Sequence, residues 1–343
     1  MNAHPKSHVP RRAPRWLAPL LAAVLVIALC WILAVTLLRP LLVQRGLPEG
    51  ARGVSNEQQQ VWQYSARLAN LEDRAEQLAD LSEGDTKLAL RGLQETLGTS
   101  VALLGELSFE NEPQPVLAQD YSEQAAAQLA VDAATASAEV PEAPDNAPQV
   151  RKVLTHSAVA LNLQARAVIA ELPKKQRPKG LTAPLAATGG AADAAPVACL
   201  AADEGVPTPG HGQDAVRDVA YALDRGYALD YIWQLTAARS GSKAAESLER
   251  RRDRLATQLA ALRAVRAPDC SDVRAPAYRL PENSLDKLPE VGNAAQRDFA
   301  FAVLDAATST SGAKRAELAE LGVDLFESLA EDEVPFDLLR AAK

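Results

Sequence analysis

Apolar residues in the last third of the chain recur at steps of three and four, the spacing that lines one face of an α-helix. Four such segments follow one another, at residues 213–239, 243–265, 289–308 and 313–331. Breaks containing Ser and Gly separate the first segment from the second and the third from the fourth. Each pair is therefore predicted to form an antiparallel helical hairpin.

A long irregular connection, residues 266–284, separates the two hairpins. Pro268, Pro276 and Pro281 exclude a continuous helix through it, because proline lacks the backbone donor that a helix interior needs. A long crossover between hairpins is typical of a ferritin-like bundle rather than of a simple up-and-down bundle. The pattern predicts such a four-helix bundle over residues 211–343.

Four more helical segments precede this bundle, at residues 56–81, 86–107, 120–138 and 149–172. Ser55, followed by Gln58, predicts a capped start for the first of them. Pro-rich breaks group the segments two and two, which predicts an N-terminal helical bundle over residues 55–172. An elongated coiled coil is the alternative.

A linker rich in Pro, Ala and Gly follows at residues 173–210. It begins with a basic patch of Lys174, Lys175, Arg177 and Lys179. This patch either keeps the linker soluble or contacts anionic lipid or cell-wall polymer.

The N-terminus has the pattern of a membrane anchor. Residues 16–38 carry no charge and, at ~1.5 Å per residue, are long enough to cross a ~30 Å hydrocarbon core. Residues 1–15 hold bases and no acid, which predicts a cytoplasmic N-terminus and a neck at residues 39–54 that leads to an extracytoplasmic remainder. A cleavable signal is the alternative, but the apolar run is long and no small-residue cleavage site follows it. The predicted location is the cell membrane, with a single pass.

Since strand patterns are nearly absent, the fold class is predicted to be all-α, with this transmembrane helix ahead of the two helical regions. The formal net charge of −8 and the pI near 5.2 speak against nucleic-acid binding. Cys199 and Cys270 lie in the part that is predicted to be extracytoplasmic, where an oxidising compartment favours a disulfide. Such a bond would close a loop of about 70 residues and contribute on the order of 4 kcal/mol by loop entropy.

Part of the C-terminal region resembles a known family. The resemblance covers residues 214–339 and rests on the segments AVRDVAYALDRGYALDYIWQLTAAR, SLERRRDRLATQL, VRAPAYRLP and KRAELAELGVDLFESL. These segments resemble the ferritin-like domain of unknown function found in exported actinobacterial proteins. The resemblance implies a four-helix bundle and an extracytoplasmic setting, and it implies no established activity.

A di-iron bundle needs Glu-x-x-His motifs on two of its helices, and the chain has none. Its histidines, His4, His8, His156 and His211, all lie outside the four C-terminal helical segments. No catalytic residue, metal ligand or cofactor is therefore predicted, and a lone helical histidine such as His156 is expected to be structural or exposed. An all-carboxylate site would draw on Asp224, Asp230, Glu246, Glu249, Asp298, Asp305, Glu317 and Glu320. These acids are instead expected on solvated faces.

Aromatic residues gather in the first C-terminal helix, in a chain that has only 4% Phe, Trp and Tyr. Tyr227, Tyr231 and Trp233 are the candidate binding face; the alternative is that the tyrosines belong to the bundle core. Tyr278 in the crossover is expected to pack on the bundle surface.

These patterns predict a membrane-anchored extracytoplasmic protein that acts as a structural or partner-binding module, without metal-dependent catalysis. Its predicted partners are the lipid bilayer, through residues 16–38, and an envelope protein or a second copy of the chain. One alternative is a ferritin-like metal-binding protein or oxidoreductase with a degenerate carboxylate site. Another is a small-molecule binder that uses the Tyr-rich helix.

Overall fold

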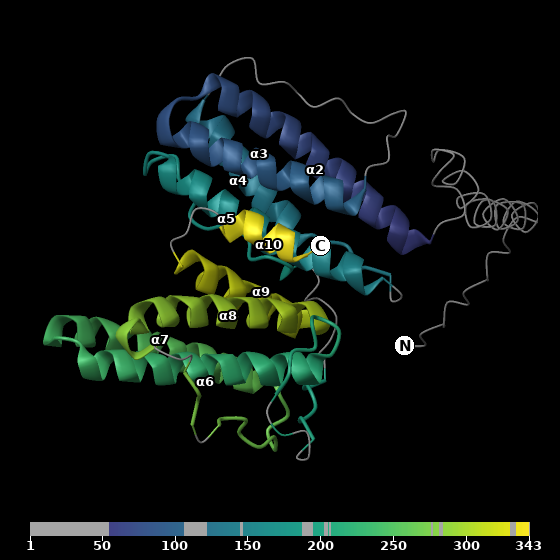
Figure 1. The fold of residues 1–343 in the computed structure, drawn as a ribbon. Coiled ribbons are helices and arrows are strands. Elements are labelled where there is room, and N and C mark those ends of the chain that lie inside the picture. The colour runs from purple at the N-terminus through teal and green to yellow at the C-terminus, as the bar shows by residue number, and fades with distance from the viewer. Residues whose placement is uncertain are drawn as a thin grey trace, which may run out of the picture. The chain divides into compact units, whose positions relative to one another are not determined.

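A computed structural model describes residues 55–105, 122–144, 147–186, 195–201, 205, 207–275, 277–280, 284–329 and 334–342 (Figure 1). The regular elements of this described part are helices, which confirms the all-α prediction. No helix within it is both long and apolar enough to cross a membrane. The basic N-terminus, the predicted anchor at residues 16–38 and the neck all lie outside the described residues.

The N-terminal helices begin and end near the predicted positions. They are α2 (Asn56–Leu81), α3 (Gly84–Leu104), α4 (Glu123–Ala138) and α5 (Pro148–Glu171). Ser55 caps α2, since its Oγ accepts a hydrogen bond from the Gln58 amide at 3.2 Å. α5 starts with Pro148, a residue that suits a first turn because its missing N–H has no helical partner there.

α5 is the central helix of the described part. Every residue from Val153 to Leu161 is buried, and a helix buried all round lies inside a core rather than on its surface. It packs against α3 and α4 on the N-terminal side of the chain and against three helices of the C-terminal side, which are introduced below. His156, on this helix, is buried, and its Nδ1 lies 2.8 Å from the Leu338 carbonyl oxygen.

The C-terminal region contains α6 (Ala215–Arg239), α7 (Ser242–Val265), a short 3-10 turn η3 (Ser284–Asp286), α8 (Leu288–Ser309) and α9 (Gly312–Glu327). α6 pairs with both α7 and α8, and α8 pairs with α9. α7 and α9 barely touch each other. The order of two hairpins and a crossover is therefore present, while the side between α7 and α9 stays loosely packed.

A further helix, α10 (Val334–Ala341), was not predicted from the sequence. Leu338 and Leu339 are buried, and the helix packs on α5 and α3 (Figure 1). Asp337 forms an ion pair with Arg297 of α8 and a second one with Arg340 at 3.2 Å. The end of the chain thereby contacts both the N-terminal and the C-terminal helices.

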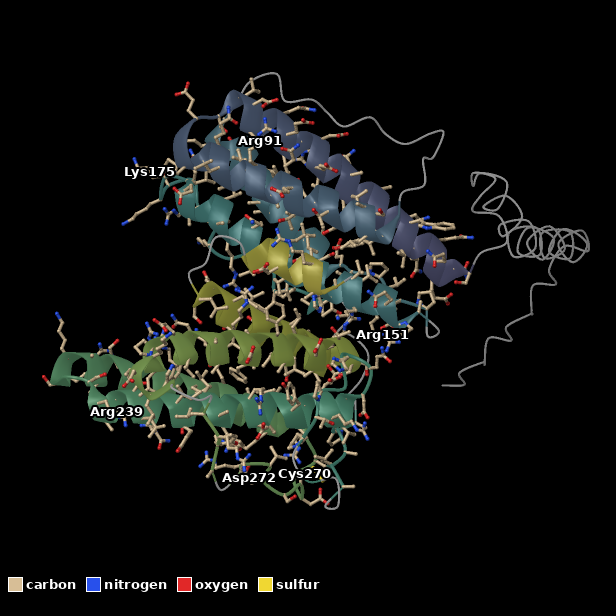
Figure 2. All side chains as sticks on the ribbon, in the orientation of Figure 1. Arg91, Arg151, Lys175, Arg239, Cys270 and Asp272 are labelled. Atoms are coloured by element: carbon tan, nitrogen blue, oxygen red, sulfur yellow. A yellow bond between two sulfur atoms is a disulfide. The ribbon has the colours of Figure 1, made fainter. Side chains whose placement is uncertain are left out.

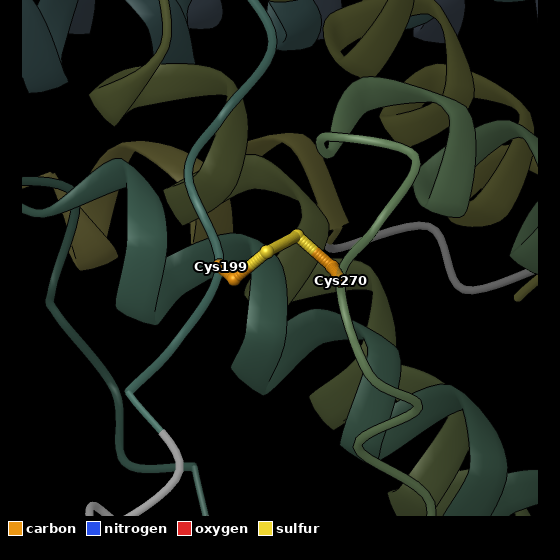
Figure 3. The surroundings of a disulfide bond; sticks show 2 residues. All are labelled: Cys199 and Cys270. Atoms are coloured by element: carbon orange, nitrogen blue, oxygen red, sulfur yellow. A yellow bond between two sulfur atoms is a disulfide. The ribbon is translucent and has the colours of Figure 1, made fainter.

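Parts of the predicted linker are held against the helices. Val197 bridges the end of α7: its amide donates to the Val265 carbonyl at 3.0 Å, and its carbonyl accepts from the Ala267 amide at 2.9 Å. A disulfide joins Cys199 to Cys270 next to this bridge (Figure 3). Arg177, from the basic patch, donates to the last carbonyls of α5, those of Ala170 and Leu172, so its charge caps a helix end.

Candidate functional site

The predicted aromatic face does not form one open surface. Tyr227 is 2% exposed, and its hydroxyl accepts a hydrogen bond from Arg263 Nη1 at 3.3 Å. The guanidinium of Arg274, from the crossover, lies 4.4 Å from the centre of the same ring. Tyr227 is therefore covered by arginine side chains.

Tyr231 and Trp233 have different neighbours. Tyr231 packs at 6.0 Å, ring centre to ring centre, against Tyr278 of the crossover. Trp233 is 7% exposed and lies beside Gly292 of α8, where an added Cβ would be 3.5 Å from the indole nitrogen. The structure thus places the two tyrosines toward the crossover and the tryptophan toward α8.

The expectation of solvated acids is wrong for Asp224, which is 1% exposed. Its carboxylate accepts hydrogen bonds from the Tyr278 hydroxyl at 3.2 Å and from Arg225 at 2.5 Å. A buried carboxylate is tolerated when such donors replace water. Burial also raises the pKa of Tyr278 to about 12, so this tyrosine stays a donor and holds the crossover on α6.

The other candidate acids are not buried. Five are exposed and two are of intermediate exposure: Glu246, Glu249, Asp298, Glu317 and Glu320 in the first group, Asp230 and Asp305 in the second. Among the described residues, the metal-ligating groups that come within 4.8 Å of one another in a set of three are Cys199, Asp269 and Cys270. Because the two cysteines already form a disulfide, their sulfurs are not free to bind a metal ion.

Asp218 is a buried carboxylate that the sequence analysis did not single out. It is 1% exposed, at the start of α6, and it accepts hydrogen bonds from the amides of Gly210 at 2.7 Å and Gly212 at 3.0 Å. Burial raises its pKa. Asp305 of α8 lies close enough for its pKa to be raised to about 6, first by burial and then by the charge of Asp218. The Gly-His-Gly sequence before the helix was the available signal, because Gly212 has φ +77°.

The first half of α7 is not buried and carries many charged residues. From Ser242 to Arg254 no residue is buried, whereas Leu255, Leu259, Leu262 and Val265 are buried in the second half. The last turn of this half contains four arginines. We call them, Arg250, Arg251, Arg252 and Arg254, the α7 ridge. Arg252 pairs with Asp230 of α6 at 2.8 Å; the other three are exposed.

A polar hollow lies on each side of this ridge. The hollow between α7, α8 and α9 has a volume of about 620 Å³, and Arg251 and Arg254 face Asp324 and Glu327 across it. Those two acids also pair with Arg166 of α5, at 3.7 and 2.9 Å.

The second hollow, of about 400 Å³, lies between α6, α7 and the crossover. Its walls are charged, with Arg252 and Arg263 from α7, Arg274 from the crossover and Asp230 from α6. Neither hollow is lined by Tyr227, Tyr231 or Trp233. The arrangement offers guanidinium donors to carboxylates that approach α7 from outside.

No family model, no curated protein and no solved structure matches this chain.

Proposed function

We propose that this protein is a membrane-anchored, extracytoplasmic helical module that binds an acidic protein partner through the α7 ridge, without metal-dependent catalysis. The observation that carries the proposal is the exposed first half of α7, which has no buried residue from Ser242 to Arg254. A helical stretch of this length has little stability of its own, and tertiary packing supplies most helix stability in proteins. A partner that packs on this half would supply the tertiary packing that the described residues do not give it.

The chemistry of the ridge favours an acidic partner. Guanidinium groups form paired hydrogen bonds with carboxylates, and arginine is enriched at protein interfaces. Arg250, Arg251 and Arg254 are exposed on a chain whose net charge is −8. The ridge thus differs in sign from the protein as a whole, which favours the docking of an acidic surface on it.

The two hollows beside the ridge can receive side chains of a partner protein. Each is lined by side chains of both charges, so an incoming acidic side chain can find arginine while an incoming base can find a carboxylate. Mixed, polar walls of this kind suit a protein surface better than an apolar small molecule, which needs predominantly hydrophobic walls.

The setting of the proposal comes from the sequence. The uncharged run at residues 16–38 supports an anchor, and the Cys199–Cys270 disulfide is compatible with an oxidising compartment. The order of α6 to α9, two hairpins and a crossover, supports a ferritin-like bundle as the fold of the C-terminal region.

The test is site-specific crosslinking in intact cells that produce the full chain. A photoreactive benzoylphenylalanine replaces Ala244, which is exposed in the first half of α7. We expect an adduct with a second, acidic protein, and we expect the double variant Arg250→Glu/Arg251→Glu to remove most of it. The matched control is Lys174→Glu/Lys175→Glu, which reverses two exposed charges outside α7 and should leave the adduct in place.

Three outcomes would contradict the proposal: an adduct that resists charge reversal on α7, an adduct equally lost in the control, or an adduct of the chain with itself alone. The catalytic alternative has a separate measurement. Stoichiometric iron, manganese or zinc retained by the purified full chain after desalting, and lost on Glu249→Gln or Asp298→Asn, would contradict the absence of a metal site.

A further inference from the structure

Arg315 is a buried arginine without an ionic partner in the described part of the chain. It lies in the first turn of α9 and is 5% exposed. Its Nη2 donates to Thr155 Oγ1 of α5 at 2.8 Å. Its Nε is shielded from water and has no hydrogen-bond partner among the described residues. A neutral hydroxyl is thus the one acceptor that the described residues give this guanidinium.

Such an arrangement is costly for a charged group. Burial lowers the pKa of Arg315 to about 10, so the side chain stays protonated at neutral pH. Transfer of an ion out of water costs several kcal/mol unless a counter-charge and hydrogen bonds replace the solvent. The Thr155 hydroxyl supplies no counter-charge, and it already donates its own proton to the Arg151 carbonyl at 2.9 Å.

Charges of both signs act on Arg315 from the segment around the start of α5. The charge of Arg151, in the first turns of α5, acts against that of Arg315 and contributes to the lowering of its pKa. Figure 2 labels Arg151 near the start of α5, and α5 packs on both α8 and α9. The carboxylate whose charge favours Arg315 is that of Glu142, an exposed residue in the segment before α5, and it forms no ion pair with Arg315.

The start of α9 supplies donors at the same place. Its N-cap residue, Ser311, makes no side-chain capping hydrogen bond. The first amides of a helix have no partner within the helix, and they carry the positive end of its dipole. Arg315 belongs to this first turn, and helical side chains lean toward the N-terminus. The buried guanidinium and the first amides of α9, which the Ser311 side chain does not cap, therefore belong to the same helix end.

We infer that the N-terminus of α9, together with Arg315 and Arg151, binds one small oxyanion at the junction of α5 and α9. Amides at a helix start and a guanidinium are the donors that phosphate and carboxylate groups prefer. The doubly charged inorganic phosphate ion is expected to bind better than a carboxylate. The anion would join the N-terminal and C-terminal helices, because Thr155 and Arg151 come from α5 and the other donors come from α9.

The test compares the thermal unfolding of the full chain, in detergent, in sodium phosphate, sodium acetate and sodium chloride at matched ionic strength. Phosphate stabilises many proteins by exclusion from their surface, so the informative quantity is the difference between variants. We expect phosphate to raise the Tm of the wild-type chain by about 3 °C more than that of Arg315→Gln, the size expected at roughly ten times the Kd.

Two variants serve as controls. Arg166→Gln removes another arginine that joins α5 to α9, but one already paired with Glu327 at 2.9 Å, and it should keep the wild-type response to phosphate. Glu142→Gln removes the competing carboxylate and should keep or strengthen that response. If Arg315→Gln does not fold, line broadening of the phosphorus-31 signal of inorganic phosphate by the wild-type chain, reversed by Arg151→Gln, provides the same information.

An Arg315-dependent response to phosphate or to acetate supports the site and assigns its anion class. An equal response of wild type and Arg315→Gln to both anions overturns it. So does a Glu142→Gln variant that is as unstable as Arg315→Gln and insensitive to phosphate, because Glu142 would then be the counter-ion of Arg315.

Discussion

Asp305 of α8 should make the protein less stable at neutral pH than at pH 4. Burial, and then the charge of Asp218, raises its pKa from 3.8 to about 6 in the folded chain. In the unfolded chain the carboxyl ionises near the ordinary value. Above pH 6 both states are ionised and folding carries the cost of the buried charge; below pH 4 both are protonated and the cost is absent.

The size of this effect follows from the shift. The interval between 3.8 and about 6 corresponds to roughly 3 kcal/mol. Asp305 is of intermediate exposure, and solvent screening reduces such values, so about 1–2 kcal/mol is expected. Asp305→Asn should therefore raise the free energy of unfolding by about 1–2 kcal/mol at pH 7.5 and leave it nearly unchanged at pH 4.

The assay is urea unfolding of the full chain in detergent, followed by circular dichroism at pH 4, 5.5 and 7.5 and fixed ionic strength. Asp298→Asn is the matched control, because Asp298 is an exposed acid on the same helix, and it should change little at any pH. A destabilised Asp305→Asn at pH 7.5, or a change of equal size at all three pH values, would refute the reasoning. The first result would mean that Lys152 and His211, whose charges lower the Asp305 pKa, stabilise the carboxylate more than burial destabilises it. The second result would mean that the change in stability does not come from the ionisation of Asp305.

Three further predictions concern the core and the disulfide. Burial lowers the pKa of His156 to about 4, so the stability contributed by this histidine should fall as pH drops from 6.5 toward 4, opposite in sign to the contribution of Asp305. In the same urea series the free energy of unfolding of the wild type relative to His156→Gln should therefore decrease over this range, and a difference that does not change with pH would contradict the assignment. Gly226→Ala should destabilise by about 1–3 kcal/mol, because the new Cβ would lie 2.5 Å from Leu259 Cδ2 and 3.0 Å from Phe299 Cε2. Gly322→Ala has no described atom within 4 Å of its Cβ and should stabilise by about 0.5–1 kcal/mol through helix propensity alone; equal unfolding midpoints for the two variants would contradict the close packing at Gly226. Replacing both Cys199 and Cys270 by Ser should lower the free energy of unfolding by up to about 4 kcal/mol, and a reducing agent should then have no further effect on the unfolding midpoint of that variant.

The helices were predictable because their signals are local. α2 and α6 to α8 combine a regular apolar spacing with Ser, Gly, Asp or Pro at their ends. α10 was not predicted because it is short and follows the acidic stretch at residues 331–333. A helix of this length is formed mainly by its packing on α5 and α3, which no local pattern reveals.

Burial of polar groups was the part that the sequence could not predict. Charged residues are seldom buried, and the rule failed at Asp218 and Asp224 because each carboxylate meets its hydrogen-bond donors only in the folded chain. The amides of Gly210 and Gly212 serve Asp218, and the Tyr278 hydroxyl, from the crossover, serves Asp224. On α5, the polar residues Thr155, His156 and Ser157 belong to the stretch from Val153 to Leu161 in which every residue is buried, although such polar side chains are mostly exposed.

The sequence predicted a binding face on α6, whereas the exposed surface in the structure lies on α7. The two differ because exposure depends on tertiary contacts. The tyrosines of α6 are aromatic and near the crossover, so the crossover and its arginines cover them. The arginines of α7 are distinguished by the neighbouring helix, because α9 does not pack closely against them. A sequence pattern predicts which residues lie on the polar face of a helix. Whether another helix packs on that face is decided by the tertiary structure.

The two proposed sites differ in how closely they are tied to the core, and this difference makes them separable. α7 packs mainly on α6, and the ridge arginines other than Arg252 are exposed, so charge reversal there should change partner binding with little effect on stability. Arg315 instead links α9 to α5, the helix on which the N-terminal and C-terminal helices both pack. An anion at Arg315 should therefore be detected as a change in the stability of the whole described unit, and Arg250→Glu/Arg251→Glu should leave that change intact. If the α7 variant instead abolished the response to phosphate, the two sites would have to be parts of a single basic surface, and neither proposal would stand in its present form.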